Sequence, residues 1–360
     1  MSDAPLRICQ VIASKGWGGL EKHFVELCNR LAERHEVTAI GHADFASKVS
    51  ERVKYITLDL TRSRWNPILL WKLRQVLRRA EPQIVHTHAN KATAMVGLVG
   101  AGRAQGARFV GSVHGFQRST GMYRRCDRVI AVSKTIAQHI LNPRVEVIYN
   151  GVAGGPGRDQ GIEGSRDQRA EMERRILPAA VAGITGARPV AIAAGRLDAV
   201  KGYDILLQAW RDVDADLLIA GDGEERERLK TQIADLRLHD RVHMLGHRSD
   251  VPALMAAADL MVISSRREGF PYVLCEALIA RTPVVSTRVP GAMEILPDAF
   301  LAPTEDAAAL SDCLKRALAN LPATRQAFEP VWRFAAENLT IEAMVAKTEQ
   351  VYRDALRAMA

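Results

Sequence analysis

The sequence predicts an α/β protein of two Rossmann-like domains, each a doubly wound parallel sheet. The chain has 360 residues, which is more than one hydrophobic core usually organises. Apolar runs of strand length alternate with helical patterns in both halves, as in parallel sheets with crossover helices. A segment rich in glycine and charge, residues 151–187, separates the two sets of runs.

Each apolar run has the length of a strand. Those of the first half are Leu6–Ile12, Val37–Ile40, Ile84–His86, Arg108–Val113, Arg128–Val132 and Val145–Ile148. Those of the second half are Pro189–Gly195, Ala215–Gly221, Arg241–Leu245, Leu260–Ser264 and Pro283–Ser286. We therefore expect an N-terminal domain at 1–152, a linker and helix at 153–187, a C-terminal domain at 188–339 and a last helix at 340–360. That helix is free to pack back towards the N-terminal domain.

Composition indicates an ordinary globular protein of a reducing compartment. Hydrophobic residues make up 48% and charged residues 25%, and no stretch approaches the roughly 20 apolar residues of a membrane span. The first residues lack the pattern of a signal peptide. Five scattered cysteines, an odd number without a Cys-x-x-Cys pair, argue against a disulfide framework or a zinc site. We expect a cytoplasmic protein.

Positive charge is concentrated in the first half of the chain. Residues 1–150 hold 23 Lys and Arg against 11 Asp and Glu, a net charge of +12, whereas the whole chain carries +8. A basic half attracts nucleic acid, an anionic membrane surface or an acidic small molecule, and charge alone does not choose among them.

Two strands of the second half end in turns that carry charged side chains, where ligands bind in open parallel sheets. Arg196 and Lys201 follow one strand, five residues apart, and could clamp a diphosphate. The alternative is a pair of solvated surface charges. Glu268 and Glu276 follow another strand, and a helix starting near Pro271 would let both face one ligand. The alternative there is a charged helix N-terminus stabilised by its dipole.

The first half offers a glycine-rich turn and a histidine at comparable positions. Gly18 and Gly19 follow the first strand and enter a helix, so the backbone there could approach a phosphate or sugar. His114 follows the strand Arg108–Val113. A lone histidine is more often structural, and we assign that structural role to His86 and His88.

Three further patterns resemble functional motifs. The glycines of 100–106 precede a strand, the reverse of a dinucleotide fingerprint, and indicate a helix end and turn. The aspartates of 212–216 precede a strand, which is the wrong end of a sheet for a metal site. The segment 62–79 predicts a helix with Asn66 as N-cap, Pro67 in the first turn and a basic face, which packs on its own sheet or contacts a membrane.

Together these motifs resemble glycosyltransferase family 4, whose members are retaining enzymes of the GT-B architecture, and in particular its bacterial lipopolysaccharide and surface-glycan type. The resemblance extends over nearly the whole chain. It rests on the early glycine turn, VHTH at 85–88, VHGF at 113–116, VIAVSK at 129–134, VIYNGV at 147–152, GRLDAVKG at 195–202, IAGDG at 219–223 and the two-glutamate element at 268–276.

The resemblance implies two Rossmann-like domains that face a central cleft, and a metal-independent transfer from a nucleotide-diphosphate sugar. Arg196 and Lys201 would hold the diphosphate, and Glu276 the ribose. Glu268 and the backbone of Gly269, Phe270, Pro271 and Tyr272 would meet the transferred sugar and distal phosphate. Gly246, His247 and Arg248 would lie near the base, with Gly18, Gly19 and His114 near the sugar. The residues implied in catalysis are His114, Glu268, Arg196 and Lys201.

We expect a hexose donor, with a UDP-sugar favoured, and no metal or other cofactor. The basic N-terminal half favours an anionic glycan or glycolipid acceptor, such as lipopolysaccharide core, met at the cytoplasmic face of the inner membrane through electrostatic contact. Two alternatives stay open: a nucleotide-sugar epimerase of the same architecture, and a non-catalytic nucleic-acid-binding protein. The second lacks interleaved aromatic residues, since aromatics are 5% of the chain, and we expect no nucleic-acid partner.

Overall fold

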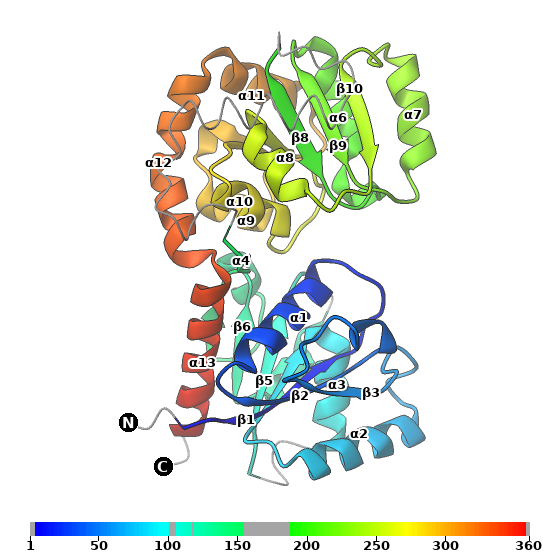
Figure 1. Ribbon diagram of the computed structural model, residues 1–360, viewed down its shortest axis with the longest axis vertical. Helices are drawn as coiled ribbons and strands as arrows, with labels where there is room; N and C mark the ends of the chain where they lie inside the picture. Colours follow the sequence, from blue (N-terminus) through cyan, green and yellow to red (C-terminus); the bar gives the residue numbers. More distant parts are fainter. Residues whose placement is uncertain (1–3, 101–105, 117–118, 155–187, 358–360) are drawn as a thin grey trace. The chain divides into compact units, whose positions relative to one another are not determined.

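A computed structural model describes residues 4–100, 106–116, 119–154 and 188–357 (Figure 1). The chain divides into two compact units. Unit 1 comprises Met1–Gly151 and Ile341–Ala360, and unit 2 comprises Val152–Thr340. Most of the expected linker and helix at 153–187 lies outside the described residues.

Unit 1 is built on a seven-stranded sheet in the order β3-β2-β1-β4-β5-β6-β7. All neighbouring strands are parallel. The strands are β1 Arg7–Ile12, β2 Glu36–Gly41, β3 Lys54–Thr57, β4 Ile84–His88, β5 Arg108–Val113, β6 Arg128–Ala131 and β7 Val145–Val147. The six expected strands are confirmed. The sequence missed β3 because this edge strand is partly exposed along its length and has no apolar run.

The helices of unit 1 form two groups. Helix α1 (Gly19–Leu31) packs beside α13 (Ile341–Arg357), and α2 (Pro67–Ala80) packs beside α3 (Ala89–Val99). A short helix, α4 (Lys134–Ala137), follows β6. Although α13 ends the chain, its apolar face is part of the unit 1 core together with β1 and α1. Unit 1 is therefore completed by a segment that follows unit 2 in the sequence.

Unit 2 is built on a six-stranded sheet in the order β10-β9-β8-β11-β12-β13, again with parallel neighbours. The strands are β8 Val190–Ala194, β9 Asp216–Ala220, β10 Val242–Gly246, β11 Leu260–Ile263, β12 Val284–Thr287 and β13 Leu301–Ala302. The five expected strands are confirmed. The sequence missed β13, whose two residues give no readable period.

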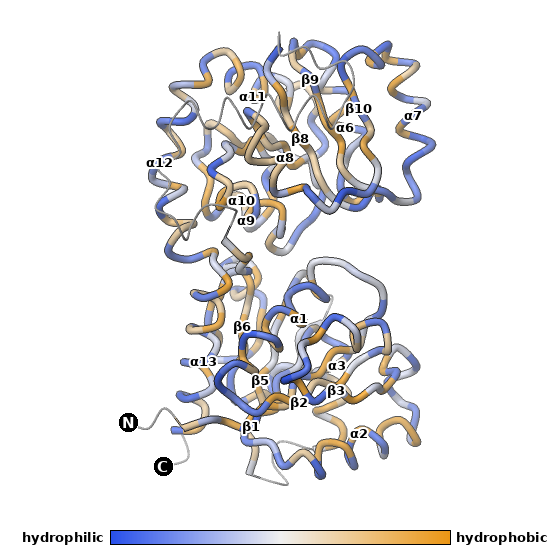
Figure 2. Tube along the Cα trace, in the orientation of Figure 1, coloured by the Kyte–Doolittle hydropathy of each residue, from blue (hydrophilic) through white to orange (hydrophobic). Residues whose placement is uncertain are grey.

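Helices of unit 2 also gather in two groups. Contacts join α6 with α7 and α11, and α9 with α8 and α12. Their bounds are α6 Tyr203–Ala209, α7 Arg226–Asp235, α8 Val251–Ala257, α9 Tyr272–Ile279, α10 Pro290–Ile295, α11 Ala307–Ala319 and α12 Leu321–Asn338. No helix among the described residues combines the length and apolar character needed to cross a bilayer. Hydropathy alternates along the outer helices, whereas the central strands are mostly apolar (Figure 2).

The strand order of each sheet reverses direction at one point, and this point locates the ligand site of such folds. In unit 1 the reversal lies between β1 and β4, and in unit 2 between β8 and β11. The loops that leave the carboxyl ends of these strands carry most of the charged and glycine-rich motifs of the sequence.

The structure describes part of each of the three motif-like patterns. Gly100 ends α3 in the left-handed conformation, with residues 101–105 outside the described part. Asp216 is the first residue of β9, and its Oδ1 lies 3.7 Å from Nη1 of Arg188 and 3.5 Å from Nε2 of His243, so the Arg188 guanidinium already faces it. Asn66 caps α2 by accepting a hydrogen bond from the Leu69 amide at 3.1 Å.

Candidate active site

The turn after β8 carries the two predicted cations of unit 2. The Arg196 side chain is two-thirds exposed, and its Nε lies 3.6 Å from Asp198. Lys201 ends a short 3-10 turn whose start is capped by Asp198, which accepts a hydrogen bond from the Lys201 amide. The Lys201 Cε lies 3.8 Å from the position of a Cβ on Gly195, so the lysine lies alongside the residue that precedes Arg196.

Lys201 forms an ion pair with Glu268 from the loop after β11. Both side chains are largely buried, with exposed fractions of 26% for Lys201 and 15% for Glu268. The same Glu268 oxygen accepts a hydrogen bond from Ser265 Oγ at 3.0 Å. Two residues 67 positions apart are thus brought together where the strand order of unit 2 reverses. A small pocket beside them is lined by Ala194, Lys201, Tyr203, Val262, Ile263, Ser264, Ser265 and Val273.

Several bonds fasten the β8 turn to the β11 loop. Ser264 Oγ donates to the Lys201 carbonyl at 2.9 Å, and the Arg266 amide donates to the Val200 carbonyl at 2.8 Å. The Arg266 guanidinium binds both carboxylate oxygens of Asp204 at 2.8 Å. These bonds hold the pKa of Asp204 below its usual value. Hydrogen bonds to the residues before and after Lys201, and to its own carbonyl, therefore fix the backbone of this turn.

Gly202 and Gly221 allow backbone segments to touch at this site. Gly202 has φ +64°, and a Cβ there would lie 2.2 Å from the Ser264 carbonyl oxygen. Gly221 follows β9 with φ +156°, and a Cβ there would lie 1.8 Å from the Gly195 carbonyl oxygen. Only a residue without a side chain fits either position, so both glycines set the spacing of the loops.

Helix α9 follows the β11 loop and carries Glu276 as its fifth residue. Pro271 is the N-cap, so the sequence placed the start of the helix within one residue. Glu268 lies in the loop before the helix, and Phe270 is buried. The backbone N–H groups at the start of a helix give this end a partial positive charge, which suits anionic oxygens.

The third predicted donor segment of unit 2 follows β10. Gly246 has φ +68° and accepts a hydrogen bond from the Gly221 amide at 2.8 Å. His247 is exposed, whereas Arg248 binds Asp250 through two hydrogen bonds of 2.8 and 2.6 Å. The Gly221 bond ties this segment to the loop after β9.

In unit 1 the predicted residues lie at the carboxyl ends of β1, β4 and β5. Gly18 is the N-cap of α1 and Gly19 its first residue. His114 follows β5, and its Nε2 lies 3.4 Å from Nδ1 of His88. His23 of α1 stacks edge-on against His114, with ring centroids 4.6 Å apart. Burial lowers the pKa of all three imidazoles, that of His23 to about 4.

His86 and His88 belong to a buried hydrogen-bond network. His86 bonds Tyr352 Oη at 2.6 Å and Ser112 Oγ at 2.7 Å. His88 Nε2 bonds the Gln10 side-chain oxygen at 2.8 Å. Because Tyr352 comes from α13, the C-terminal helix is bonded directly to the central strands of unit 1.

Sequence reasoning missed the side chains that position the site. Arg266 and Asp204 pair with each other although they are 62 positions apart, and no sequence pattern distinguishes Arg266 from its neighbour Arg267. Ser265 pairs with Glu268, three residues away. His23 was also missed. Its helical position, one turn after Gly18–Gly19, was the available signal.

Comparison with known proteins connects this geometry to a family. The Glycosyltransferase Family 4 model matches residues 17–153, and the Glycosyl transferases group 1 model matches residues 179–330. The chain belongs to glycosyltransferase family 4. The two matches lie on the two sheets, and the second includes both the Lys201 turn and the Glu268 loop.

Curated relatives of this family 4 member include a lipopolysaccharide core enzyme and an N-acetyl-α-D-glucosaminyl L-malate synthase. The lipopolysaccharide core biosynthesis glycosyltransferase LpsE of Rhizobium meliloti is 29% identical over 288 residues, 76% of this chain and 77% of its own length. The N-acetyl-α-D-glucosaminyl L-malate synthase of Bacillus anthracis is 30% identical over 243 residues, 64% of this chain and 60% of its own length.

Solved structures with the same fold include known glycosyltransferases. Anabaena HepE in complex with UDP superposes with a TM-score of 0.80 at 21% identity, covering 96% of this chain and 99% of HepE. WaaG, a glycosyltransferase involved in lipopolysaccharide biosynthesis, gives a TM-score of 0.70 at 17% identity, with coverage of 96% and 99%. The GT-B fold class expected from the sequence is confirmed.

Proposed function

We propose that this family 4 enzyme transfers a hexose from a nucleotide-diphosphate sugar, with UDP-sugars favoured, to a lipid-linked surface glycan such as lipopolysaccharide core, with retention of configuration. The observation that carries the proposal is the Lys201–Glu268 pair at the reversal point of the unit 2 sheet. It places a cation and a carboxylate side by side where a nucleotide sugar would present its phosphates and its hydroxyl groups.

The departing nucleoside diphosphate needs its negative charge stabilised in the transition state. Lys201 is held in place by Glu268 and by the bonds to its turn, so it needs little reorganisation when that charge develops. Exposed Arg196 offers a planar pair of donors from the same turn. We assign the leaving-group stabilisation to these two side chains and to the first amides of α9.

The remaining contacts follow from position along the same loops. Glu276 would accept hydrogen bonds from the ribose, and Glu268 from the transferred sugar. The base would lie near residues 246–248. Gly18–Gly19 and His114 of unit 1 would approach the sugar. We favour a same-face ion-pair step for retention, since the sequence offers no well-placed nucleophile.

The acceptor proposal rests on charge and on the relatives. Residues 1–150 carry a net charge of +12, which suits an anionic glycan. LpsE is named as a lipopolysaccharide core enzyme, and HepE has been solved with UDP-glucose. The charge and the likeness to LpsE favour a surface glycan as acceptor, and the likeness to HepE favours a nucleotide sugar as donor.

Helix α2 supports contact with a membrane surface. Leu69, Leu73 and Leu77 of this helix are buried. Ile68 and Trp71 of the helix, and Trp65 just before it, are more than 60% exposed. Exposed Lys72, Arg74, Arg78 and Arg79 accompany them. Aromatic side chains next to cations are typical of surfaces that lie at the boundary of anionic lipid.

Vesicle sedimentation tests the membrane proposal. Wild-type protein should bind anionic vesicles in low salt and dissociate as salt rises. Replacing Arg78 and Arg79 by Glu should abolish binding, whereas the same charge change at exposed Arg211 and Lys315 of unit 2 should not. Equal binding to neutral and anionic vesicles would remove the basis for this contact.

Incubation with labelled nucleotide sugars tests the reaction itself. With an acceptor extract from envelope glycolipids, the label should move from the nucleotide to the lipid fraction. Conversion of the sugar without any acceptor would instead identify an epimerase. Failure to consume any nucleotide sugar would reject the proposed transfer.

A further inference from the structure

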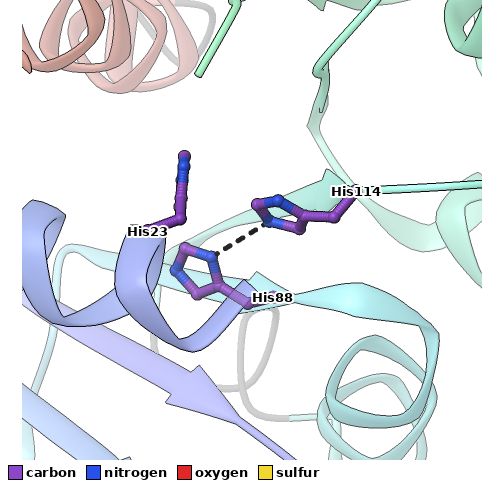
Figure 3. Close-up of side chains that lie close together, drawn as sticks. All are labelled: His23, His88 and His114. Carbon is purple, nitrogen blue, oxygen red and sulfur yellow. Dashed lines mark hydrogen bonds between the residues drawn. The ribbon is translucent and has the colours of Figure 1, made fainter. Parts of the chain in front are cut away.

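Three histidines of unit 1 gather at the carboxyl ends of its central strands. His23 comes from α1, His88 ends β4 and His114 follows β5 (Figure 3). One nitrogen atom from each ring lies within 4.8 Å of the corresponding atom of the other two. The facing nitrogens of His88 and His114 are 3.4 Å apart. Tetrahedral zinc with Zn–N bonds of about 2.0–2.1 Å separates its nitrogen ligands by about 3.3–3.4 Å.

A hydrogen bond at Nε2 of His88 leaves its other ring nitrogen, Nδ1, available to bind a cation. Its Nε2 lies 2.8 Å from the side-chain oxygen of Gln10, an acceptor, so Nε2 carries the proton. Nδ1 therefore presents a lone pair towards His114. The Gln10 amide is itself held in place, because its nitrogen donates to Tyr352 Oη at 2.9 Å. A histidine whose second nitrogen donates to an oriented oxygen is the usual arrangement of a metal ligand.

His23 supplies the second observation. The residue is 3% exposed and its ring forms a hydrogen bond with Asn150, but its Nδ1 atom is buried without a hydrogen-bond partner among the described residues. A buried polar atom without a partner costs free energy unless something else satisfies it. A metal ion bound to His23 Nδ1 would supply that partner.

We propose that His23, His88 and His114 form a binding site for one transition-metal ion, with Zn²⁺ as the ion expected. Imidazole nitrogens suit Zn²⁺, and three protein ligands leave its fourth position open. His114 is the least buried of the three and gives the ion its route of entry. All three ligands belong to unit 1, whereas the Lys201 turn, to which we assign leaving-group stabilisation, belongs to unit 2.

Zn²⁺ bound at this site should affect sugar transfer, an expectation that rests on the proposed function. A bound ion would occupy the His114 nitrogen that we expect to approach the transferred sugar. Added Zn²⁺ should therefore inhibit transfer, and EDTA should restore the rate.

Calorimetry of the full chain with Zn²⁺ tests the site without using activity. We expect one ion per chain, and His23→Gln and His114→Gln should each weaken binding by at least ~10-fold. His139→Gln is the control, since His139 is an exposed histidine of the same unit. Co²⁺ bound at the wild-type site should show the visible spectrum of a four-coordinate ion, which His23→Gln should abolish.

Two results would overturn the metal site. One is the absence of Zn²⁺ binding at micromolar concentration, and the other is equal binding by wild type, His23→Gln and His114→Gln. Because the measurement does not depend on any sugar, a protein that binds Zn²⁺ but transfers nothing even in EDTA would refute the proposed function alone. Binding without inhibition would retain the metal site and contradict the placement of His114 beside the sugar.

Discussion

The close approach of the two loops in unit 2 can be tested by giving Gly202 a side chain. In Gly202→Ala, the new Cβ would lie 2.2 Å from the Ser264 carbonyl oxygen and 3.2 Å from its carbon. Both atoms are backbone, so no side chain can rotate away. The turn must withdraw by about 1 Å to reach an ordinary contact distance.

Two costs add up in this variant. Holding alanine at φ +64° costs about 1–2 kcal/mol, and forcing apart a packed contact costs about 1–3 kcal/mol more. We therefore expect the free energy of unfolding of unit 2 to fall by about 2–5 kcal/mol. A shift of about 1 Å would also move Lys201 away from Glu268, and misplacement on that scale can lower turnover by ~10².

Gly100→Ala provides a matched control for the left-handed backbone alone. Gly100 has φ +66°, and a Cβ there would meet no atom within 4 Å. Urea unfolding should show a loss of about 1–2 kcal/mol for this variant, with unchanged donor affinity by calorimetry. If Gly202→Ala lost no more stability than Gly100→Ala and kept its turnover, the packed contact between the two loops would be wrong.

Three further predictions concern individual side chains. Lys201→Ala should lower turnover by ~10² or more in a steady-state assay, because it removes charge stabilisation from the transition state; near-normal turnover would reject the diphosphate clamp. Glu276→Ala should weaken binding of the free nucleotide diphosphate in calorimetry, whereas Glu268→Ala should impair transfer with that affinity largely kept; equal losses would contradict their separate roles. Burial lowers the pKa of His86 from 6.5, its value in the unfolded chain, to about 3. The free energy of unfolding should therefore fall as the pH drops below about 6.5, and the loss should reach about 2 kcal/mol at about pH 5. Urea unfolding of His86→Gln should show a pH dependence smaller by that amount, and an unchanged one would contradict this assignment.

The sequence predicted most of the fold because the strands are buried on both faces. Such strands are continuous apolar runs, as in β8 and β9, where every residue is buried. The two missed strands, β3 and β13, lack this signal, since one is partly exposed and the other has two residues. Their place at sheet edges depends on neighbours that the local sequence does not describe.

The candidate site was predictable as far as the strand ends. Arg196, Lys201 and Glu268 follow strands that the apolar pattern identifies, so their place at one edge of the sheet could be inferred. The contact between Lys201 and Glu268 depends on β8 and β11 being neighbours, and several topologies fit the same alternation. The histidine cluster was missed for the same reason, because it requires α1, β4 and β5 to meet.

The dependence of the transfer rate on divalent cations tests the central claim most directly, namely that side chains of the β8 turn stabilise the leaving diphosphate. Purified enzyme would be assayed with its donor and acceptor in EDTA, and then with graded magnesium or manganese. We predict that the rate in EDTA equals or exceeds the rate without chelator, and that added magnesium does not raise it. A strict requirement for magnesium or manganese, with activity lost in EDTA and restored by the ion, would contradict this mechanism.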